Sequence, residues 1–312
     1  AIFARGERFR AVVPPAFSAD ADCSKMGNCT SGEQRPESES VLVVAGGVSL
    51  PVRTQRRFGW KKDLPDYRDK VLAFLRTRGL PRTCDLRKGV QFPPVYDQGD
   101  LGSCTANAIA AAIHFCQIKE KIADWEGSRL FIYYNERACE NTIDEDSGAS
   151  MRDGCIVCAK LGVCPETMWP YIPDKFTERP SSGCYTEALK YCVKEYARIP
   201  QTLEDFKCCL NNGFPFVFGF IVCSSFMTEE VAATGKMTMP QPTDYVMGGH
   251  AVMCVGYDDD TQCFIIRNSW GASWGCEGYF FMPYQYMCHE QLAQDFWCIR
   301  VVDGVDFPCK RS

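Results

Sequence analysis

The chain has 312 residues, of which 46% are apolar and 23% charged, so it is long enough to bury a core and to form more than one lobe. Its longest apolar runs fall far short of the roughly 18–20 residues that a membrane-spanning helix needs. The net charge of −5 offers no basic surface for nucleic acid or for an anionic membrane. We therefore expect a monomer whose partner is a peptide or protein, with no nucleic acid and no membrane.

The 20 cysteines are many for this length, although fewer than in a small disulfide scaffold. They favour an oxidising compartment, whether secreted, lysosome-like or virion-associated, and they predict disulfide bonds whose pairing cannot be read from the sequence. Residues 1–10 carry three arginines and no apolar stretch follows them, so we recognise no signal peptide there.

Residues 1–79 differ in composition from the rest and are interpreted as an N-terminal extension. Positions 18–40 are rich in Ser, Asp, Glu and Gly, which is typical of a loop or a disordered segment. A strand interrupted by two glycines is expected at 41–52. A helix is expected at 66–78, where Asp66 can cap the first turn and Gly79 follows the last.

Residues 80–312 are expected to form one domain with two lobes. Helical patterns come first, at 104–117, 128–139, 150–161 and 202–210. Strand patterns follow, at 214–223, 250–257, 262–267, 278–282 and 297–302. Helices followed by strands predict an α+β fold with a helical lobe at about 80–200 and a β-rich lobe at about 201–312. We expect the site in the cleft between the lobes, because ligand sites favour domain interfaces.

Two motifs far apart in the chain carry chemistry that makes sense only when both are present. Cys104 ends the motif QGDLGSC and begins a predicted helix. His250 lies 146 positions later in the motif GGHA, and Asn268 follows after 18 more in NSWG. A thiol, an imidazole and an amide in this order predict a nucleophile, a general base and a group that orients the base.

Each of these side chains has an expected role. A cysteine at a helix N-terminus that faces an imidazolium should have a lowered pKa, which favours the thiolate. His250 would take the thiol proton and return it to the leaving amine, and Asn268 would fix the ring. Gln98 offers an NH2 group that could form an oxyanion hole with the backbone N–H of Cys104. Trp270 would shield the bond between His250 and Asn268 from water.

Together these motifs resemble the papain family of cysteine peptidases, over about residues 80–285. The matching stretches are the Gln and Cys of 98–104, GHA at 249–251 and NSWGxxWGxxGY at 268–279. LPxxxDLR at 80–87 resembles the start of the mature enzyme in this family. When residues are counted from Leu80, Cys104 is residue 25. The stretch 96–108 is most similar to the bacterial and large-virus branch, whereas GGHA is similar to cathepsin B.

The resemblance implies a two-lobed papain-like fold and a cysteine endopeptidase that works through a thioester, with no cofactor and no metal. It also implies subsites: Gly148 and Ala149 would bond the peptide backbone, Met151 and Ala251 would line an apolar S2 pocket, and Trp270 is counted among the substrate-binding residues. Residues 1–79 stand in the place of a propeptide or of a segment that blocks the cleft, so the enzyme is expected to be latent until that segment moves or is cleaved.

Some features depart from the family pattern. Thr105 replaces the aromatic residue usual after the nucleophile, and Leu101 stands where many relatives carry a disulfide cysteine. The chain contains no His-His pair, which favours endopeptidase over dipeptidyl-carboxypeptidase action. Two alternatives stay open: a catalytically impaired papain-fold protein that binds or has a structural role, and an acyl transferase or ligase that uses the same thioester.

Overall fold

The computed structural model describes residues 41–44, 48–51, 58–72, 79–89, 92–121 and 124–300. All of them belong to the unit formed by residues 39–312, and the smaller unit at 1–38, with most of the loop expected at 18–40, lies outside the described part. None of the helices in these ranges is both long and apolar enough to cross a membrane.

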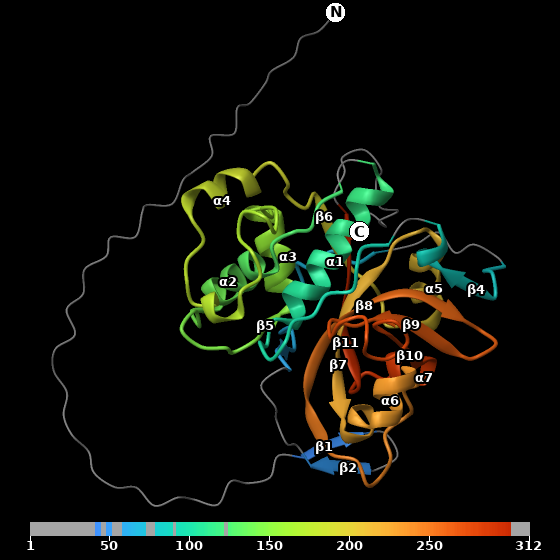
Figure 1. Cartoon of the computed structure of the whole chain (residues 1–312). Helices are drawn as coiled ribbons and strands as arrows, with labels where there is room; N and C mark the ends of the chain where they lie inside the picture. The colour runs from blue at the N-terminus through green and yellow to red at the C-terminus, as the bar shows by residue number, and fades with distance from the viewer. Residues whose placement is uncertain are drawn as a thin grey trace, which may run out of the picture. The chain divides into compact units, whose positions relative to one another are not determined.

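Within the described residues, seven strands form an antiparallel sheet at the centre of this unit (Figure 1). Six of them follow the spatial order β10, β9, β8, β7, β11 and β6, and β4 pairs with β8. Their bounds are β4 (Thr83–Asp85), β6 (Glu195–Arg198), β7 (Phe216–Cys223), β8 (Val246–Asp258), β9 (Cys263–Arg267), β10 (Tyr279–Pro283) and β11 (Ala293–Arg300). Two small sheets accompany it, a hairpin of β1 (Val41–Val44) and β2 (Val48–Pro51), and a parallel pair of β3 (Trp60–Lys61) and β5 (Ala149–Ser150).

Helices cover both faces of the large sheet. The bounds are α1 (Cys104–Lys119), α2 (Arg129–Glu140), α3 (Met151–Lys160), α4 (Ser182–Ala188), α5 (Leu203–Asn211), α6 (Glu229–Thr234) and α7 (Tyr284–Met287), with short 3₁₀ helices at Leu86–Lys88, Pro173–Lys175 and Ser224–Met227. Helix α1 packs against β8 and is contacted by α2 and α3. Figure 1 shows α2, α3 and α4 gathered on one side of the strands.

The alternation of side chains along β7 explains why the sheet has a core on each face. Phe216, Phe218 and Phe220 point to one face and join a core with α5 and α7, while Val217 points to the other face and joins a core with α1, α2 and α3. Both faces are covered, so β7 is apolar throughout. The result is the α+β fold with a helical and a β-rich lobe that the order of elements predicts.

Most of the expected elements are confirmed within a few residues. The predicted helices correspond to α1, α2, α3 and α5, and the predicted strands to the β1–β2 hairpin and to β7 through β11, although β8 and β11 each begin four residues earlier than expected. The short elements β3, β4, β6, α4, α6 and α7 were not predicted, whereas β5 falls in the stretch that the resemblance assigns to the substrate strand. They are two to seven residues long, so their periodicity is too brief to recognise.

The helix expected at 66–78 is wrong where it is described. Residues 66–68 form a turn, because the Asp66 carboxylate accepts bonds from the backbone and guanidinium N–H groups of Arg68. The chain then extends, and Val71 pairs in parallel with Arg198 of β6. Contacts distant in sequence therefore override the local helical pattern. Residues 73–78 lie outside the described part.

The seventeen cysteines in the described ranges are all free thiols. Most are buried in the cores, where they pack as small apolar side chains. The disulfide bonds expected from the composition are thus not formed among these residues. The side chains of Cys164 and Cys184, and those of Cys209 and Cys298, interact with each other as thiols.

Candidate active site

Cys104 is the first residue of α1 and is fully buried. The turn before it is held from two directions. The Asn107 side chain donates to the carbonyl and hydroxyl oxygens of Ser103, at 2.9 and 3.0 Å, and the Gly102 N–H donates to the Asp146 carboxylate at 3.0 Å. The thiol therefore sits in a rigid loop at the start of a helix, where unpaired N–H groups gather.

His250 on β8 and Asn268 at the end of β9 are brought together as the sequence predicts. Nε2 of His250 lies 2.8 Å from Oδ1 of Asn268, and both side chains are buried. Oδ1 also accepts a bond from the backbone N–H of Ser269, at 2.8 Å, which fixes the amide. The indole of Trp270 stacks on the imidazole, with ring centroids 4.8 Å apart and planes at 27°. Trp270 thus covers this pair, as expected.

Gln98 is also buried, and it joins the nucleophile loop to the loop after Asn268. Its Nε2 donates to the carbonyl of Leu101 at 2.9 Å, and its Oε1 accepts a bond from the Ser269 hydroxyl at 2.6 Å. Backbone bonds run between the same loops, from the Gln98 N–H to Ser269 at 2.9 Å and from the Gly271 N–H to Tyr96 at 2.9 Å. Gln98 is therefore held beside the loop that carries Cys104.

Cys104 meets the β-rich lobe next to His250. The thiol interacts with the backbone N–H of Ala251, the residue after His250, and also with the N–H groups of Gly59 and Thr105. Burial nevertheless raises the pKa of Cys104 to about 12. The lowered pKa expected from the sequence is wrong for this covered state, because the thiol is shut off from solvent.

The segment 58–72 is what covers the thiol. A Cβ at Gly59 would lie 1.7 Å from the carbonyl oxygen of Gly102, so only a glycine can pass this close to the nucleophile loop. The ring of Phe58 lies 6.1 Å from His250, edge to face, and 6.1 Å from Trp270. This segment therefore contacts both the loop that carries Cys104 and the rings of His250 and Trp270.

Of the two residues predicted to bind a peptide backbone, Ala149 bonds this segment, and Gly148 lies directly against it, since a Cβ at Gly148 would lie 2.0 Å from the carbonyl oxygen of Gly59. The Ala149 N–H donates to the carbonyl of Gly59 at 2.8 Å, and β3 continues the pairing in parallel with β5. Lys61 adds an ion pair with Glu140, at 2.6 Å. The strand assigned to substrate is thus occupied by the chain's own residues.

Trp60 lies in the same buried core cluster as the residues expected to line the S2 pocket. Its ring packs so tightly against the sheet that a Cβ at Gly219 would lie 1.9 Å from it, and one at Gly249 2.6 Å. Met151 and Ala251, the expected wall residues, are fully buried in the same core cluster as Trp60. The indole N–H of Trp60 donates to the carboxylate of Asp295 at 3.2 Å. The sequence did not reveal this acidic partner.

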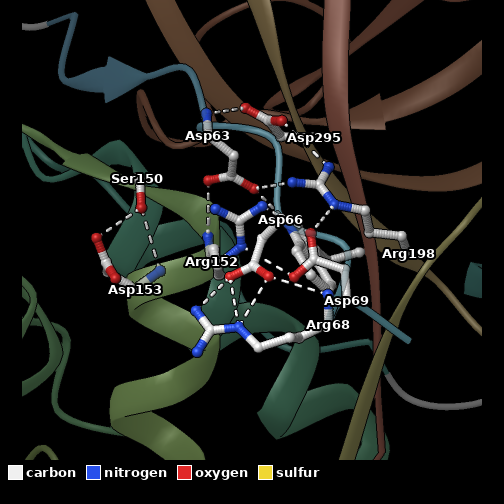
Figure 2. Close-up of polar contacts among 10 residues, drawn as sticks. Asp63, Asp66, Arg68, Asp69, Ser150, Arg152, Asp153, Arg198 and Asp295 are labelled. Carbon is white, nitrogen blue, oxygen red and sulfur yellow. Dashed lines mark hydrogen bonds and ion pairs between the residues drawn. The ribbon is translucent and has the colours of Figure 1, made fainter. Parts of the chain in front are cut away.

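An ion-pair cluster anchors the remainder of the segment (Figure 2). Asp63 accepts bonds from Nη2 of Arg198 at 2.7 Å, from the indole of Trp297 at 2.9 Å and from the backbone N–H of Arg152 at 3.0 Å. Asp69 is bonded by both Arg152 and Arg198, each with a shortest contact of 2.6 Å. The two arginines come from α3 and from β6 of the large sheet, so the segment is tied to a helix and to the sheet.

Asp295 of β11 completes this cluster. It accepts bonds from the Asp63 N–H at 2.8 Å and from Nη1 of Arg198 at 3.2 Å. Burial, together with the nearby Asp63 carboxylate, raises the pKa of Asp295 to about 6. Burial acts in the same direction on Asp69, but there the guanidinium groups of Arg152 and Arg198 dominate and hold its pKa below the usual range.

Comparisons with known proteins agree on the family. The model described as papain family cysteine protease matches residues 80–296, which is more than half of the chain. An uncharacterized peptidase C1-like protein of Acanthamoeba polyphaga mimivirus is 44% identical over 272 residues, covering 79% of this chain and 88% of that protein. The chain belongs to the papain family of cysteine proteases.

Solved structures show the same fold for this peptidase. Xylellain, a cysteine protease from Xylella fastidiosa, is 44% identical with a TM-score of 0.74, over 80% of this chain and 98% of xylellain. A procathepsin B from Trypanosoma congolense, at 19% identity and a TM-score of 0.63, shows the fold alone. The mimivirus protein and xylellain, from a large virus and a bacterium, confirm the branch that the sequence predicts. The similarity of GGHA to cathepsin B stays a prediction.

Several residues around the site could not be recognised from the sequence. Trp60, Asp63 and Asp69 lie in the run WKKDLPDYRD, whose alternating charges are typical of a solvated surface. Arg198 and Asp295 carry no motif at all, because their importance comes from ion pairs with a distant segment. In the described ranges, no three His, Cys, Asp or Glu side chains converge in a way that could hold a metal ion.

Proposed function

We propose that this peptidase is an endopeptidase with Cys104 as nucleophile and His250 as general base, and that residues 58–72 hold it latent. The observation that supports the proposal best is the path of Gly59, whose backbone passes between Cys104 and Ala149. A substrate peptide needs this same path. The segment must therefore leave before the thiol can react.

Acylation follows from the positions of the side chains. Nε2 of His250 is bonded to Asn268, so Nδ1 is the nitrogen that takes the thiol proton. Sulfur then attacks the scissile carbonyl carbon, and the oxyanion forms. One hydrogen of Gln98 Nε2 is donated to Leu101; we assign the other, with the backbone N–H of Cys104, to this oxyanion. The intermediate collapses to a thioester as His250 protonates the departing amine.

Deacylation reverses the proton transfers with water in place of the amine. His250 removes a proton from water, the hydroxide adds to the thioester, and the carboxylic acid leaves as the thiol is restored. Asn268 keeps the imidazole in one orientation throughout, and the stacked Trp270 keeps water from competing for their hydrogen bond.

Substrate binding should reuse the contacts that the segment now makes. The backbone N–H of Ala149 would bond a substrate carbonyl in place of Gly59, and the backbone of Gly148, directly before strand β5, would offer a second contact. The space now filled by Trp60, beside Met151 and Ala251, would receive the P2 side chain. Large side chains with an apolar body are therefore expected at P2.

Covalent labelling of the full chain tests both parts of the proposal. An epoxysuccinyl inhibitor should label Cys104 slowly in the wild-type chain. Gly59→Ala should accelerate the labelling about tenfold or more, because the added methyl group cannot fit against Gly102 and the covered state loses population. Gly59 has no positive φ, so alanine adds only bulk.

Two controls make the result specific. Gly183→Ala is the matched change, since a Cβ there meets its nearest atom at 3.7 Å, and it should leave the labelling slow. Cys104→Ala should remove the label and all turnover while the folding transition stays close to wild type. Fast labelling of the wild-type chain would contradict latency, and full activity of Cys104→Ala would contradict the mechanism.

A further inference from the structure

The residue after the nucleophile has a buried partner on the neighbouring helix. Thr105 donates its hydroxyl to Oε2 of Glu136 at 2.9 Å, and both side chains are fully buried. Thr105 belongs to the first turn of α1, directly beside Cys104, and Glu136 lies on α2. A hydroxyl and a carboxyl group thus occupy the place where the family pattern predicts an aromatic residue.

The carboxyl group of Glu136 lies in a site that suits its neutral form. Its second oxygen, Oε1, has no hydrogen-bond partner among the described residues. Gly154 of α3 faces that oxygen so closely that a Cβ there would lie 2.3 Å away, which leaves no room for a further polar side chain. A buried carboxylate with one hydrogen bond is strongly disfavoured, and such a group holds its proton instead.

The charges around Glu136 act in both directions. Burial raises the pKa of Glu136 to about 8. The hydrogen bond from Thr105 and the positive charge of Arg137 oppose this rise, while the carboxylates of Glu140 and Asp153 add to it. From α1 the facing ionisable group is the thiol of Cys104, and from α3 the thiols of Cys155 and Cys158.

The charge state of Glu136 matters for the nucleophile. A negative charge on Glu136 raises the pKa of Cys104, which works against the thiolate. A neutral Glu136 holds Thr105 without this penalty. The same side chain can therefore hold the nucleophile's helix in place and leave the thiolate undisturbed, provided that it keeps its proton.

We propose that Glu136 is a positioning residue for Cys104, which anchors the first turn of α1 through Thr105 as a neutral acid and impairs the nucleophile when it ionises at alkaline pH. The inference rests on the proposed role of Cys104 as nucleophile. It adds a residue of α2, outside the recognised motifs, to the groups that control the reaction.

The first test measures stability on the full chain and does not require an open cleft. Because the folded state keeps the Glu136 proton to higher pH than the unfolded state does, folding should weaken through this group as pH rises from about 4.5 to about 8. Glu136→Gln stays neutral and should gain stability relative to wild type across that window. The urea midpoints of both chains at a series of pH values report the difference.

The second test measures turnover in full chains that all carry Gly59→Ala. In the parent, kcat/KM should fall as pH becomes alkaline. In Glu136→Gln this fall should begin about one pH unit higher, so that kcat/KM at a fixed alkaline pH is about tenfold greater than in the parent. Glu120→Gln is the matched control, since Glu120 is also an acid with a raised pKa but lies at the far end of α1, and it should leave the limb unchanged.

Thr105 provides a separate check of the anchoring. Thr105→Ser keeps the hydroxyl and should keep kcat within about twofold of the parent, whereas Thr105→Val should lose about tenfold in kcat, because it leaves the Glu136 carboxyl group without its donor. KM should stay unchanged in both variants. A purely structural role would instead lower the stability of both variants without lowering kcat in Thr105→Val alone.

The results separate this inference from the proposed function. An identical pH dependence of stability and of kcat/KM in the parent and in Glu136→Gln would overturn the role of Glu136. An inactive Gly59→Ala parent would instead contradict the proposed function, and the urea series would then decide whether Glu136 is a neutral acid.

Discussion

Asn268 shows how closely single residues control this site. Its Oδ1 receives bonds from His250 and from the Ser269 backbone, so the amide is fixed on one side and holds the imidazole on the other. Trp270 adds a flat apolar cover at 4.8 Å. The orientation of His250, the proposed base, therefore depends on one amide oxygen, and its loss can be measured without changing Cys104, the proposed nucleophile.

Asn268→Ala is expected to lower kcat about 10- to 100-fold with little change in KM. The reason is that one orienting hydrogen bond contributes about 1–3 kcal/mol, and each 1.36 kcal/mol corresponds to tenfold in rate. Steady-state kinetics in the Gly59→Ala background give the measurement, with Asn212→Ala at the end of α5 as a control. A higher KM with unchanged kcat would show that Asn268 acts on substrate binding and not on His250.

At the scale of elements, the segment 58–72 combines three kinds of contact. Its backbone pairs with β5, its Trp60 ring fills the space against β7 and β8, and its carboxylates bind arginines of α3 and β6. Exposed ion pairs contribute little to stability, but these are half-buried or buried and share several hydrogen bonds. The apolar anchor at Trp60 is expected to dominate, because buried aromatic side chains carry most of the energy of an interface.

Trp60→Ala should release the segment in the full chain. Removing a buried tryptophan costs about 3–5 kcal/mol, which is enough to populate a state with Cys104 uncovered. The rate of epoxysuccinyl labelling at Cys104 should rise accordingly. Leu64→Ala is the control from the same segment, since Leu64 is 80% exposed. Labelling of Trp60→Ala as slow as that of wild type would mean that the ion pairs alone hold the segment.

On the scale of the whole molecule, the ion-pair cluster joins both lobes through one segment. Arg152 belongs to the helical lobe, whereas Arg198 and Asp295 belong to the sheet, and Asp63 and Asp69 connect them (Figure 2). A change in charge within this cluster should therefore affect global stability and not only a local contact.

Asp295 makes this dependence testable by pH. Its pKa is raised to about 6, so the folded chain keeps a proton that the unfolded chain loses near pH 4. The contribution of Asp295 to the free energy of unfolding is greatest below about pH 4. It is lost as pH rises through 6, by about 2–3 kcal/mol in total. The neighbouring charges that set this behaviour are Asp63 and Arg198.

Asp295→Asn should remove this slope between pH 4 and 6, as measured by urea unfolding of the full chain. The expected direction is that wild type loses stability relative to the variant as pH rises in that window. Asp260→Asn, at an exposed ion pair with Arg82, serves as the control and should change the curve little. A wild-type curve parallel to that of Asp295→Asn would show that Asp295 titrates normally.

The sequence by itself determined the chemistry. Cys104, His250 and Asn268 could be found because each needs a specific side chain in a fixed local setting, and these settings persist as short motifs. The long helices and strands could be found because their burial imposes a repeating apolar pattern. What a residue does locally, through its own side chain and its immediate neighbours, is visible in such patterns.

Only the tertiary structure decided what surrounds that chemistry. Residues 66–72 have a helical pattern but form a turn and then extend beside Arg198. Asp295 carries no motif but accepts the indole bond of Trp60, and Thr105 is only a departure from the family pattern until its bond to Glu136 is seen. In each case the deciding partner lies tens to hundreds of positions away. Contacts of that kind depend on how the whole chain packs, and burial and paired charge then outweigh the weak local preferences that a sequence reveals.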